Sequence, residues 1–285
     1  MFPAGEGSKN FSTLSDILEF LASEHLTRSD CVAALGGGVV GDMAGFAAAS
    51  YLRASGTSSC PPRCSPPVDS CRGRQDRHRP QGREEPGRGL SPARRRALRH
   101  GLPQVPAAGG LADGAAEAIK TGVLCDESLF ALFEDGTLTA APAEVIARCV
   151  QYKAGVVERD EKEQGERRLL NLGHTVGHAI EKCSQYTIPH GHAVAAGLAV
   201  MARSAEALGW TETPIAARIA ACLTKNGLPV STPYPPELLA EAALADKKRA
   251  GGDITVVVPE RIGKCALRKM PVTELLPVIR AGWEA

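Results

Sequence analysis

The chain has 285 residues, enough for one large domain or two modest ones, and 33 basic against 32 acidic residues give a net charge of +1. This balance argues against a dedicated nucleic-acid surface, and no apolar run in the sequence is long enough to span a membrane. The nine cysteines form no disulfide framework, and the N-terminus lacks the basic-then-apolar order of a signal peptide. We therefore expect a cytoplasmic protein.

The first fifty residues show an α/β pattern. Apolar residues at helical spacing predict a helix over residues 11–26, and the apolar run from Cys31 to Leu35 predicts a buried strand. A glycine-rich turn follows from Gly36 to Asp42, and the small residues from Met43 to Leu52 predict a second helix. This order of strand, turn and helix lets backbone N–H groups approach a pyrophosphate, although glycine-rich turns also serve tight packing. The turn alone therefore leaves nucleotide binding open.

Residues 54–107 differ from the rest of the chain, because they are dense in Arg, Pro, Ser and Gly and lack apolar periodicity. So few apolar side chains cannot offset the entropy of ordering the chain, and this composition favours disorder. Two other interpretations are weaker. Cys60 and Cys64 lack the second pair that a zinc site needs, and the run from Arg94 to Arg96 lacks the aromatic neighbours of a nucleic-acid-binding segment.

A helix is predicted again over residues 111–122, LADGAAEAIKTG, where Glu117 and Lys120 are three residues apart on one face. For an isolated pair, this spacing is typical of an ion pair on the protein surface. Further on, Arg167 and Asn171 are four residues apart, which on a helix gives them a common face. Arginine binds oxyanions with two parallel hydrogen bonds, so this face suits a phosphate or carboxylate of a substrate.

Four of the seven histidines lie within residues 169–194, the stretch LLNLGHTVGHAIEKCSQYTIPHGHAV. His174 and His178 are four residues apart, so on a helix both imidazoles point from one face. Pro189 interrupts the pattern and is expected to present His190 on a loop. Three imidazoles, or two and a carboxylate, with one position left open are the ligands of a catalytic zinc ion. The alternative is a histidine-rich helix end with solvated rings.

The C-terminal half is predicted to be mostly helical. Apolar residues three and four apart predict helices over residues 128–133, 143–157, 193–208, 213–226, 237–245 and 272–283. A β-like run extends from Asp253 to Val258, and Lys247 and Lys248 before it are typical of solvated surface charge.

Three segments carry a longer pattern. Residues 36–46 read G-G-G-V-x-G-D-x-x-G-F, residues 114–120 read G-x-A-E-x-I-K, and residues 153–194 read K-A-x-V-V-x-x-D-E-x-E-x-G-x-R-x-x-L-N-x-G-H-T-x-G-H-A-I-E and then H-G-x-A-V. In all three, the chain resembles the 3-dehydroquinate synthase family. The resemblance implies an incomplete α/β, Rossmann-like NAD-binding domain over residues 1–108 and a mostly α-helical metal- and substrate-binding domain over residues 109–285, with the active site in a cleft between them.

The resemblance also implies roles for individual residues. Glu117, His174 and His190 are expected to hold a divalent metal ion, Zn2+ or Co2+. Contacts with a sugar phosphate substrate are implied for Lys120, Lys153, Glu163, Arg167, Asn171, His178 and Lys248. Contacts with NAD are implied for Glu6, Lys9, Gly37, Gly38, Val39, Asp42 and Asp69.

The activity that the resemblance implies is the conversion of 3-deoxy-D-arabino-heptulosonate 7-phosphate into 3-dehydroquinate and phosphate, in the shikimate pathway. In the family, NAD transiently oxidises the C5 hydroxyl, phosphate leaves by β-elimination, the hydride returns and an intramolecular aldol step closes the ring. The family tends to dimerise, so a homodimer is expected if the NAD domain is intact. No nucleic-acid or membrane partner is expected.

The chain departs from the family pattern in several places. The family has further strands ahead of the point at which this chain begins. His192 stands where the family usually has Glu, and it is a less favoured candidate for a further metal ligand. The chain also lacks the lysine of a G-G-K-T-G motif. When residues 54–67 and 72–106 are back-translated and the reading frame is moved by one nucleotide, the family's G-G-K-T-G motif and the strand before it can be read. We therefore interpret these two segments as out-of-frame translation. The alternatives are a related cyclase, an aminodehydroquinate or 2-deoxy-scyllo-inosose synthase, or an inactive remnant that only binds metal.

Overall fold

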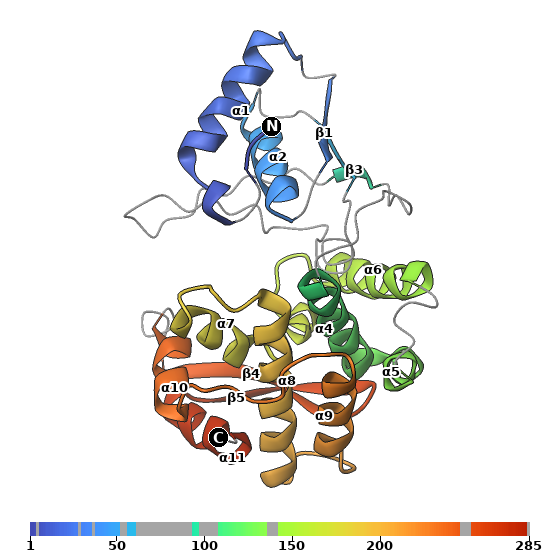
Figure 1. Ribbon diagram of the computed structural model, residues 1–285, viewed down its shortest axis with the longest axis vertical. Coiled ribbons are helices and arrows are strands. Elements are labelled where there is room, and N and C mark those ends of the chain that lie inside the picture. Colours follow the sequence, from blue (N-terminus) through green and yellow to red (C-terminus); the bar gives the residue numbers. More distant parts are fainter. Residues whose placement is uncertain are drawn as a thin grey trace. The chain divides into compact units, whose positions relative to one another are not determined.

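A computed structural model gives the fold of the chain, which divides into two compact units, Met1–Val105 and Pro106–Ala285 (Figure 1). The structure describes residues 1–3, 6–27, 30–35, 38–51, 56–60, 93–96, 108–135, 142–245 and 252–283.

The N-terminal unit combines a parallel sheet with helices. Its elements are the 3-10 helix η1 (Glu6–Ser8), α1 (Phe11–Ser23), β1 (Cys31–Leu35), α2 (Gly38–Ser50), β2 (Gly56–Cys60) and β3 (Ala93–Arg96). The strands lie in the order β1-β2-β3, and both neighbouring pairs are parallel. Leu14 and Leu21 of α1 share a small core with Met43 and Ala47 of α2. The α/β class predicted for this half of the chain is confirmed.

Two of these strands, β2 and β3, lie inside residues 54–107, where the composition predicts disorder. The pairing has a simple physical reason, because parallel strands are joined through backbone N–H and C=O groups that every residue except proline carries. Segments rich in Gly, Ser or Arg can therefore extend a sheet that β1 begins. The register of β2 against β3 shifts between Thr57 and Ser58, so this pairing is irregular.

The C-terminal unit is mostly helical, as predicted. Its helices are α4 (Ala108–Cys125), α5 (Glu127–Glu134), α6 (Pro142–Arg159), η2 (Glu166–Asn171), α7 (His174–Cys183), α8 (His190–Ala207), α9 (Ala216–Lys225), α10 (Pro236–Leu244), η3 (Val272–Glu274) and α11 (Leu275–Gly282). An antiparallel hairpin joins β4 (Asp253–Arg261) to β5 (Lys264–Pro271). The strand β5 escapes prediction because most of its residues are exposed or half-buried, which hides the alternation of a half-buried strand.

The prediction that His190 lies on a loop is wrong. Pro189 has an extended backbone, with φ −59° and ψ 146°, and is the last residue before α8, so His190 is the first helical residue. The helix therefore begins three residues earlier than the apolar pattern from Ala193 indicates, since the first turn carries polar residues that this pattern does not count.

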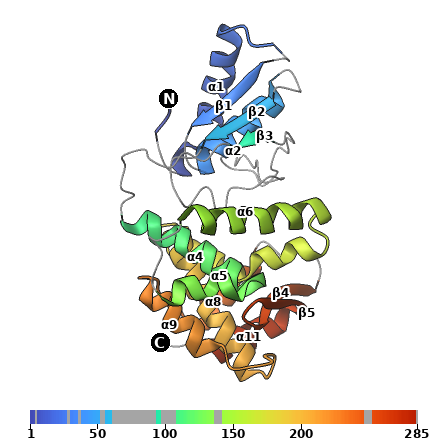
Figure 2. The same cartoon turned by 90° about the vertical axis from the view of Figure 1, so that its right-hand side faces the viewer.

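The core of the C-terminal unit forms around α8, whose residues from Ala193 to Ala202 are all buried. The elements α4, α7, α9, α11 and β4 contact it (Figures 1 and 2). Most of these α8 residues are Ala, Gly or Val, so neighbouring backbones can approach closely. Among the described residues, no helix is both long and apolar enough to cross a membrane. The helices α4 and α7 are thus fixed to α8 by a shared core.

The start of α5 is held by Asp126, which contacts two helices. Its Oδ1 caps α5 by accepting a hydrogen bond from the backbone N–H of Leu129 at 3.0 Å. Its Oδ2 accepts a hydrogen bond from Arg148 Nε of α6, also at 3.0 Å. Burial alone would raise the pKa of Asp126, but the hydrogen bonds from Arg148, Ser128 and Leu129 outweigh it and lower the pKa below its ordinary value.

An Asp126→Ala variant is expected to lose about 1–2 kcal/mol of unfolding free energy at pH 7, the usual cost of a lost cap. Because the folded-state pKa lies below the unfolded one, the carboxylate stabilises the fold at neutral pH, and this contribution disappears as the pH falls through the folded-state pKa. Urea denaturation at pH 7 and pH 3 measures the difference, which should shrink at pH 3. Glu241→Ala on the exposed side of α10 is the control. An equal loss at both pH values would contradict a role for the ionised carboxylate.

Candidate metal centre

Glu117 of α4 lies at the buried end of the candidate site. It is 3% exposed, and Lys120, one turn later, is 4% exposed. Lys120 Nζ donates a hydrogen bond to Glu117 Oε2 at 2.5 Å. A Glu and a Lys three residues apart on a helix typically form an ion pair on the protein surface. Here the two side chains are buried, because α4 packs against both α5 and α8. A buried ion pair of this kind is costly unless all of its polar atoms are satisfied.

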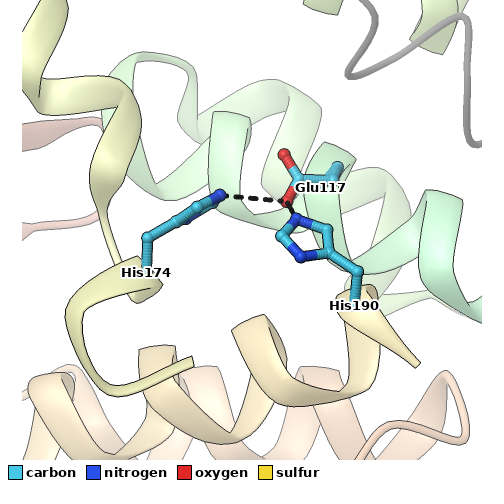
Figure 3. A group of neighbouring side chains, drawn as sticks. All are labelled: Glu117, His174 and His190. Atoms are coloured by element: carbon cyan, nitrogen blue, oxygen red, sulfur yellow. Dashed lines mark ion pairs between the residues drawn. The ribbon is translucent and has the colours of Figure 1, made fainter. Parts of the chain in front are cut away.

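Two imidazoles face the other carboxylate oxygen of Glu117 (Figure 3). The distance from Glu117 Oε1 to His174 Nε2 is 3.9 Å, and the distance to His190 Nε2 is 3.6 Å. His174 is the first residue of α7 and His190 the first residue of α8, and their ring centroids are 5.3 Å apart. The three side chains therefore come from three helices and are brought together by tertiary packing.

Glu117 Oε1 is buried but has no hydrogen-bond partner. Leaving a buried charged oxygen unpaired is costly, so this atom requires a partner. The ligand atoms of Glu117, His174 and His190 lie within 4.8 Å of one another. One carboxylate oxygen and two imidazole nitrogens are ligands typical of an open divalent metal site. The three residues therefore fit a divalent metal ion that keeps at least one position open.

The protonation states of Glu117 and His174 suit metal binding, whereas His190 has a proton to lose. Burial lowers the pKa of His174 to about 3, with the charge of Lys120 acting in the same direction, so the ring is neutral. Burial raises the pKa of Glu117, but Lys120 and the two histidines outweigh it and hold the pKa well below its ordinary value. Burial lowers the pKa of His190, but Glu117 and Glu181 raise it to about 10. A metal ion at Nε2 of His190 would displace that proton.

His178 follows His174 by one turn of α7, as the spacing predicts. Its ring centroid is 5.1 Å from that of His174 and 6.1 Å from that of His190. The side chain of His178 is 61% exposed, in contrast to the buried His174. Partial desolvation of the ring by neighbouring atoms lowers the pKa of His178. His178 therefore borders the centre at a place that a dissolved ligand can reach.

Arg167 and Asn171 lie on the 3-10 helix η2, and the predicted common face is wrong. With three residues per turn, positions four apart point about 120° away from each other. The buried Arg167 donates from Nη1 to the carbonyl oxygen of Glu161 at 2.9 Å, and Asn171 Nδ2 donates to Glu163 Oε1 at 3.1 Å. Both side chains therefore brace the loop between α6 and η2. Lys153 is half-buried on α6.

The predicted NAD residues belong to the N-terminal unit. Lys9 Nζ donates to Asp42 Oδ2 at 2.6 Å, so these two residues are paired with each other. Glu6 begins η1, Gly38 is the first residue of α2 and Val39 is half-buried on α2. Three predicted residues lie outside the part of the chain that the structure describes: Gly37, Asp69 and Lys248.

Glu181 borders the centre and is missed by the sequence reasoning. Its Oε1 is 3.0 Å from Nδ1 of His190. A signal for it exists, because Glu181 follows His178 by three residues and His174 by seven, which places all three on one face of a helix.

Asp113 is a second missed residue. Its Oδ1 accepts hydrogen bonds from the backbone N–H of His192 at 3.2 Å and from Nδ1 of the same residue at 2.9 Å. Asp113 lies one turn before Glu117 on α4, and His192 lies in the first turn of α8. The imidazole of His192 thus joins the two helices, which argues against its use as a further metal ligand.

A His192→Glu variant is expected to be less stable by about 2 kcal/mol, since a hydrogen bond to a charged group is lost and two carboxylates are brought together. The double variant Asp113→Asn/His192→Glu should recover most of this loss, because the Asn amide can donate to the new carboxylate. Thermal and urea denaturation of the two single variants and the double variant form a thermodynamic cycle. Strictly additive effects would contradict a direct contact between the two side chains.

Two solved structures share the fold. The 2-epi-5-epi-valiolone synthase ValA from Streptomyces hygroscopicus, with NAD+ and Zn2+ bound, matches with a TM-score of 0.83 and 24% identity, over 98% of this chain and 81% of that chain. A 2-deoxy-scyllo-inosose synthase complexed with carbaglucose-6-phosphate, NAD+ and Co2+ matches with a TM-score of 0.84 and 22% identity, over 99% of this chain and 81% of that chain. This chain therefore shares its fold with these two synthases.

Sequence similarity defines the family to which the chain belongs. Residues 1–76 match the model of the 3-dehydroquinate synthase N-terminal domain, and residues 114–249 match that of the C-terminal domain. The 3-dehydroquinate synthase of Pelobacter propionicus is 38% identical over 288 residues, which cover 97% of this chain and 79% of that protein. The 3-dehydroquinate synthase of Neisseria meningitidis serogroup A is 39% identical over 285 residues with the same coverage. The chain belongs to the 3-dehydroquinate synthase family, a family of lyases.

Proposed function

We propose that the chain converts 3-deoxy-D-arabino-heptulosonate 7-phosphate into 3-dehydroquinate and phosphate, with NAD and a divalent metal ion, Zn2+ or Co2+, as cofactors. The observation that carries this proposal is the unpartnered buried Oε1 of Glu117, which His174 and His190 face. The chain that holds it is 38% identical to a 3-dehydroquinate synthase. The NAD+ and Zn2+ or Co2+ bound in two structures of the same fold support this pair of cofactors.

In this proposal, Glu117, His174 and His190 hold the metal ion. A bound divalent ion would polarise a substrate hydroxyl and lower its pKa. Lys120 binds one carboxylate oxygen of Glu117, which leaves the other oxygen facing the two imidazoles. Nδ1 of His174 donates to the carbonyl oxygen of Leu172 at 3.1 Å, so its Nε2 presents a lone pair toward Glu117. These contacts prepare the ligand atoms of Glu117 and His174 before substrate binds.

Positioning of the anionic substrate is assigned to further side chains of the C-terminal unit. The exposed ring of His178 suits the phosphate, because it borders the buried His174 and the half-buried His190. Arg167 uses one of its five N–H donors on Glu161, so its guanidinium can also bind a carboxylate. Glu163 accepts a hydrogen bond from Asn171 and so orients that amide. The further substrate contacts proposed are Lys120, Lys153 and Lys248.

NAD is assigned to the N-terminal unit, at Glu6, Lys9, Gly37, Gly38, Val39, Asp42 and Asp69. The parallel strand β1 leads to α2 within two residues, the arrangement in which a pyrophosphate binds at a helix N-terminus. The first turn of α2 carries no acidic residue that would repel a pyrophosphate. The described residues of this unit therefore fit a dinucleotide.

Phosphate release by the full chain tests the proposal. With the heptulosonate phosphate, NAD and Co2+ or Zn2+, we expect phosphate and 3-dehydroquinate in equal amounts, loss of both after chelation, and recovery when the ion is restored. Release from a different sugar phosphate alone would favour a related cyclase. Retained metal without NAD binding or phosphate release would show an inactive remnant.

A homodimer is part of the proposal, on the resemblance to the family. Sedimentation equilibrium should give twice the mass of the 29.9 kDa chain. A single-chain mass at micromolar concentration would contradict it.

A further inference from the structure

Glu181 connects α7 to the metal-binding end of α8. Its carboxylate Oε1 lies 3.0 Å from Nδ1 of His190, and its side chain is only 15% exposed. Its other oxygen, Oε2, lies 4.0 Å from Nε2 of His178. Glu181 is therefore a mostly buried carboxylate whose hydrogen-bond partner is a proposed metal ligand.

His190 is held between two carboxylates, one at each ring nitrogen. Nε2 faces Glu117 Oε1 at 3.6 Å, and Nδ1 faces Glu181 Oε1 at 3.0 Å. A neutral imidazole has one donor nitrogen and one acceptor nitrogen, whereas an ionised carboxylate only accepts. When a metal ion displaces the proton of Nε2, the contact with Glu181 keeps the remaining proton on Nδ1, so the lone pair of Nε2 is directed at the ion.

His174 reaches the same tautomer by a different contact. Its Nδ1 lies 3.1 Å from the carbonyl oxygen of Leu172, a neutral acceptor. The two histidines of the centre thus have equivalent tautomers, one fixed by a backbone dipole and the other by a full negative charge. A carboxylate behind an imidazole makes the ring a stronger base and a stronger metal ligand. His190 is the histidine that receives this assistance.

We propose that Glu181 is a positioning residue for His190. It fixes the orientation of the ring and its Nδ1–H tautomer, and it strengthens metal binding through His190 without contacting the ion. This inference rests on the proposed function, because it takes Glu117, His174 and His190 as the metal ligands.

A competing role for Glu181 is that of a ligand in a second metal site. Its carboxylate, His178 and His190 also bring three ligand atoms within 4.8 Å of one another. If Glu181 bound a metal ion together with Nδ1 of His190, Nδ1 would have to give up the proton that Glu181 accepts. Such a site would also make no use of Glu117 Oε1, the buried oxygen that has no hydrogen-bond partner. The geometry therefore favours positioning.

Metal affinity of Glu181 variants tests the inference. The full chain is stripped with a chelator, and Co2+ binding is measured by competition with a chromogenic chelator. We expect Glu181→Ala to bind Co2+ about 10- to 100-fold more weakly, the usual effect of losing a partner behind a histidine ligand. Stoichiometry should remain one ion per chain. Glu181→Gln should recover part of the affinity, because its amide oxygen accepts from Nδ1 but carries no charge.

The absorption spectrum of bound Co2+ separates positioning from a merely structural role. The visible bands of the Glu181→Ala protein should shift, because the ring of His190 is no longer held, whereas those of Glu181→Gln should stay close to wild type. Glu241→Gln on α10 is the matched control, since Glu241 is exposed. Thermal melting of the metal-free proteins shows which variants are folded.

Wild-type affinity and spectra in both Glu181 variants would overturn the inference. Two Co2+ ions per wild-type chain, with one lost in both variants, would also overturn it, since Glu181 would then be a ligand. A wild-type chain that binds no Co2+ would overturn the proposed metal centre itself. The failure of the inference and the failure of the proposed function thus have different signatures.

Discussion

A His174→Ala variant is expected to purify without stoichiometric metal and to lose phosphate release. His174 supplies one of the two imidazoles that face Glu117 Oε1, and its removal deletes a ligand outright. Loss of a residue that only hydrogen-bonds to a metal ligand weakens metal binding by up to about 100-fold, and the loss of His174 itself should weaken it further. Metal analysis of the purified protein and Co2+ titration of the stripped protein measure it.

Two other histidines make this experiment specific. His178→Ala should retain the metal ion, because the ring of His178 is exposed and belongs to the substrate side of the proposed site. His25→Ala, at an exposed position of the N-terminal unit, controls for adventitious binding by surface imidazoles. Stoichiometric zinc in the His174→Ala protein would contradict the assignment of His174 as a metal ligand, whatever the effect of the substitution on turnover.

The spacing of His174 and His178 predicts their common helix face, and the structure has both on α7. Spacing does not decide which of them meets Glu117, because that depends on how α4 and α7 each pack against α8. The family resemblance supplied that choice, and the structure brings His174 rather than His178 to the buried oxygen. Assignment of Glu117, His174 and His190 as ligands stays a prediction until metal binding is measured.

Other parts of the site depend on features that side-chain periodicity does not carry. Whether residues 166–171 form a 3-10 helix or an α-helix is decided by the backbone, and the choice moves Arg167 away from the face of Asn171. The start of α8 at His190 follows from the extended Pro189 before it. The spacing places Glu181 on the face of His174 and His178, but its contact with His190 is recognisable only once α7 and α8 are side by side, since His190 is nine residues further along the chain.

Glycines occupy the crossing of α7 and α8, which sets the distance between His174 and His190, the two histidines proposed as metal ligands. A Cβ built on Gly197 of α8 would collide with the carbonyl oxygen of Gly173 and lie 2.8 Å from the backbone nitrogen of Gly177. A Cβ on Gly177 would lie 3.1 Å from Cα of Val194. Gly173 has a φ of 75°, which glycine adopts without strain, and it directly precedes His174. The two backbones therefore touch at the point from which His174, a proposed metal ligand, projects.

A Gly197→Ala variant is expected to lose about 3 kcal/mol of unfolding free energy, at the upper end of the usual cost of overpacking, because the new methyl group meets backbone atoms that cannot rotate away. Relief of the overlap requires α7 to move at Gly173, and His174 moves with it. Co2+ affinity should therefore fall together with stability. Urea denaturation of the metal-free protein and Co2+ titration of the folded protein measure the two effects separately.

Gly252→Ala is the matched control, since a Cβ at Gly252 meets nothing within 4 Å and its φ is not positive. Its effect on stability should stay within about 0.5 kcal/mol, and its Co2+ affinity should equal that of the wild type. If Gly197→Ala loses stability but binds Co2+ normally, the crossing stabilises the fold without setting the ligand distance. Wild-type stability of Gly197→Ala would instead show that α8 can shift as a rigid body. The close approach of the two backbones would then have no part in holding His174 and His190 together.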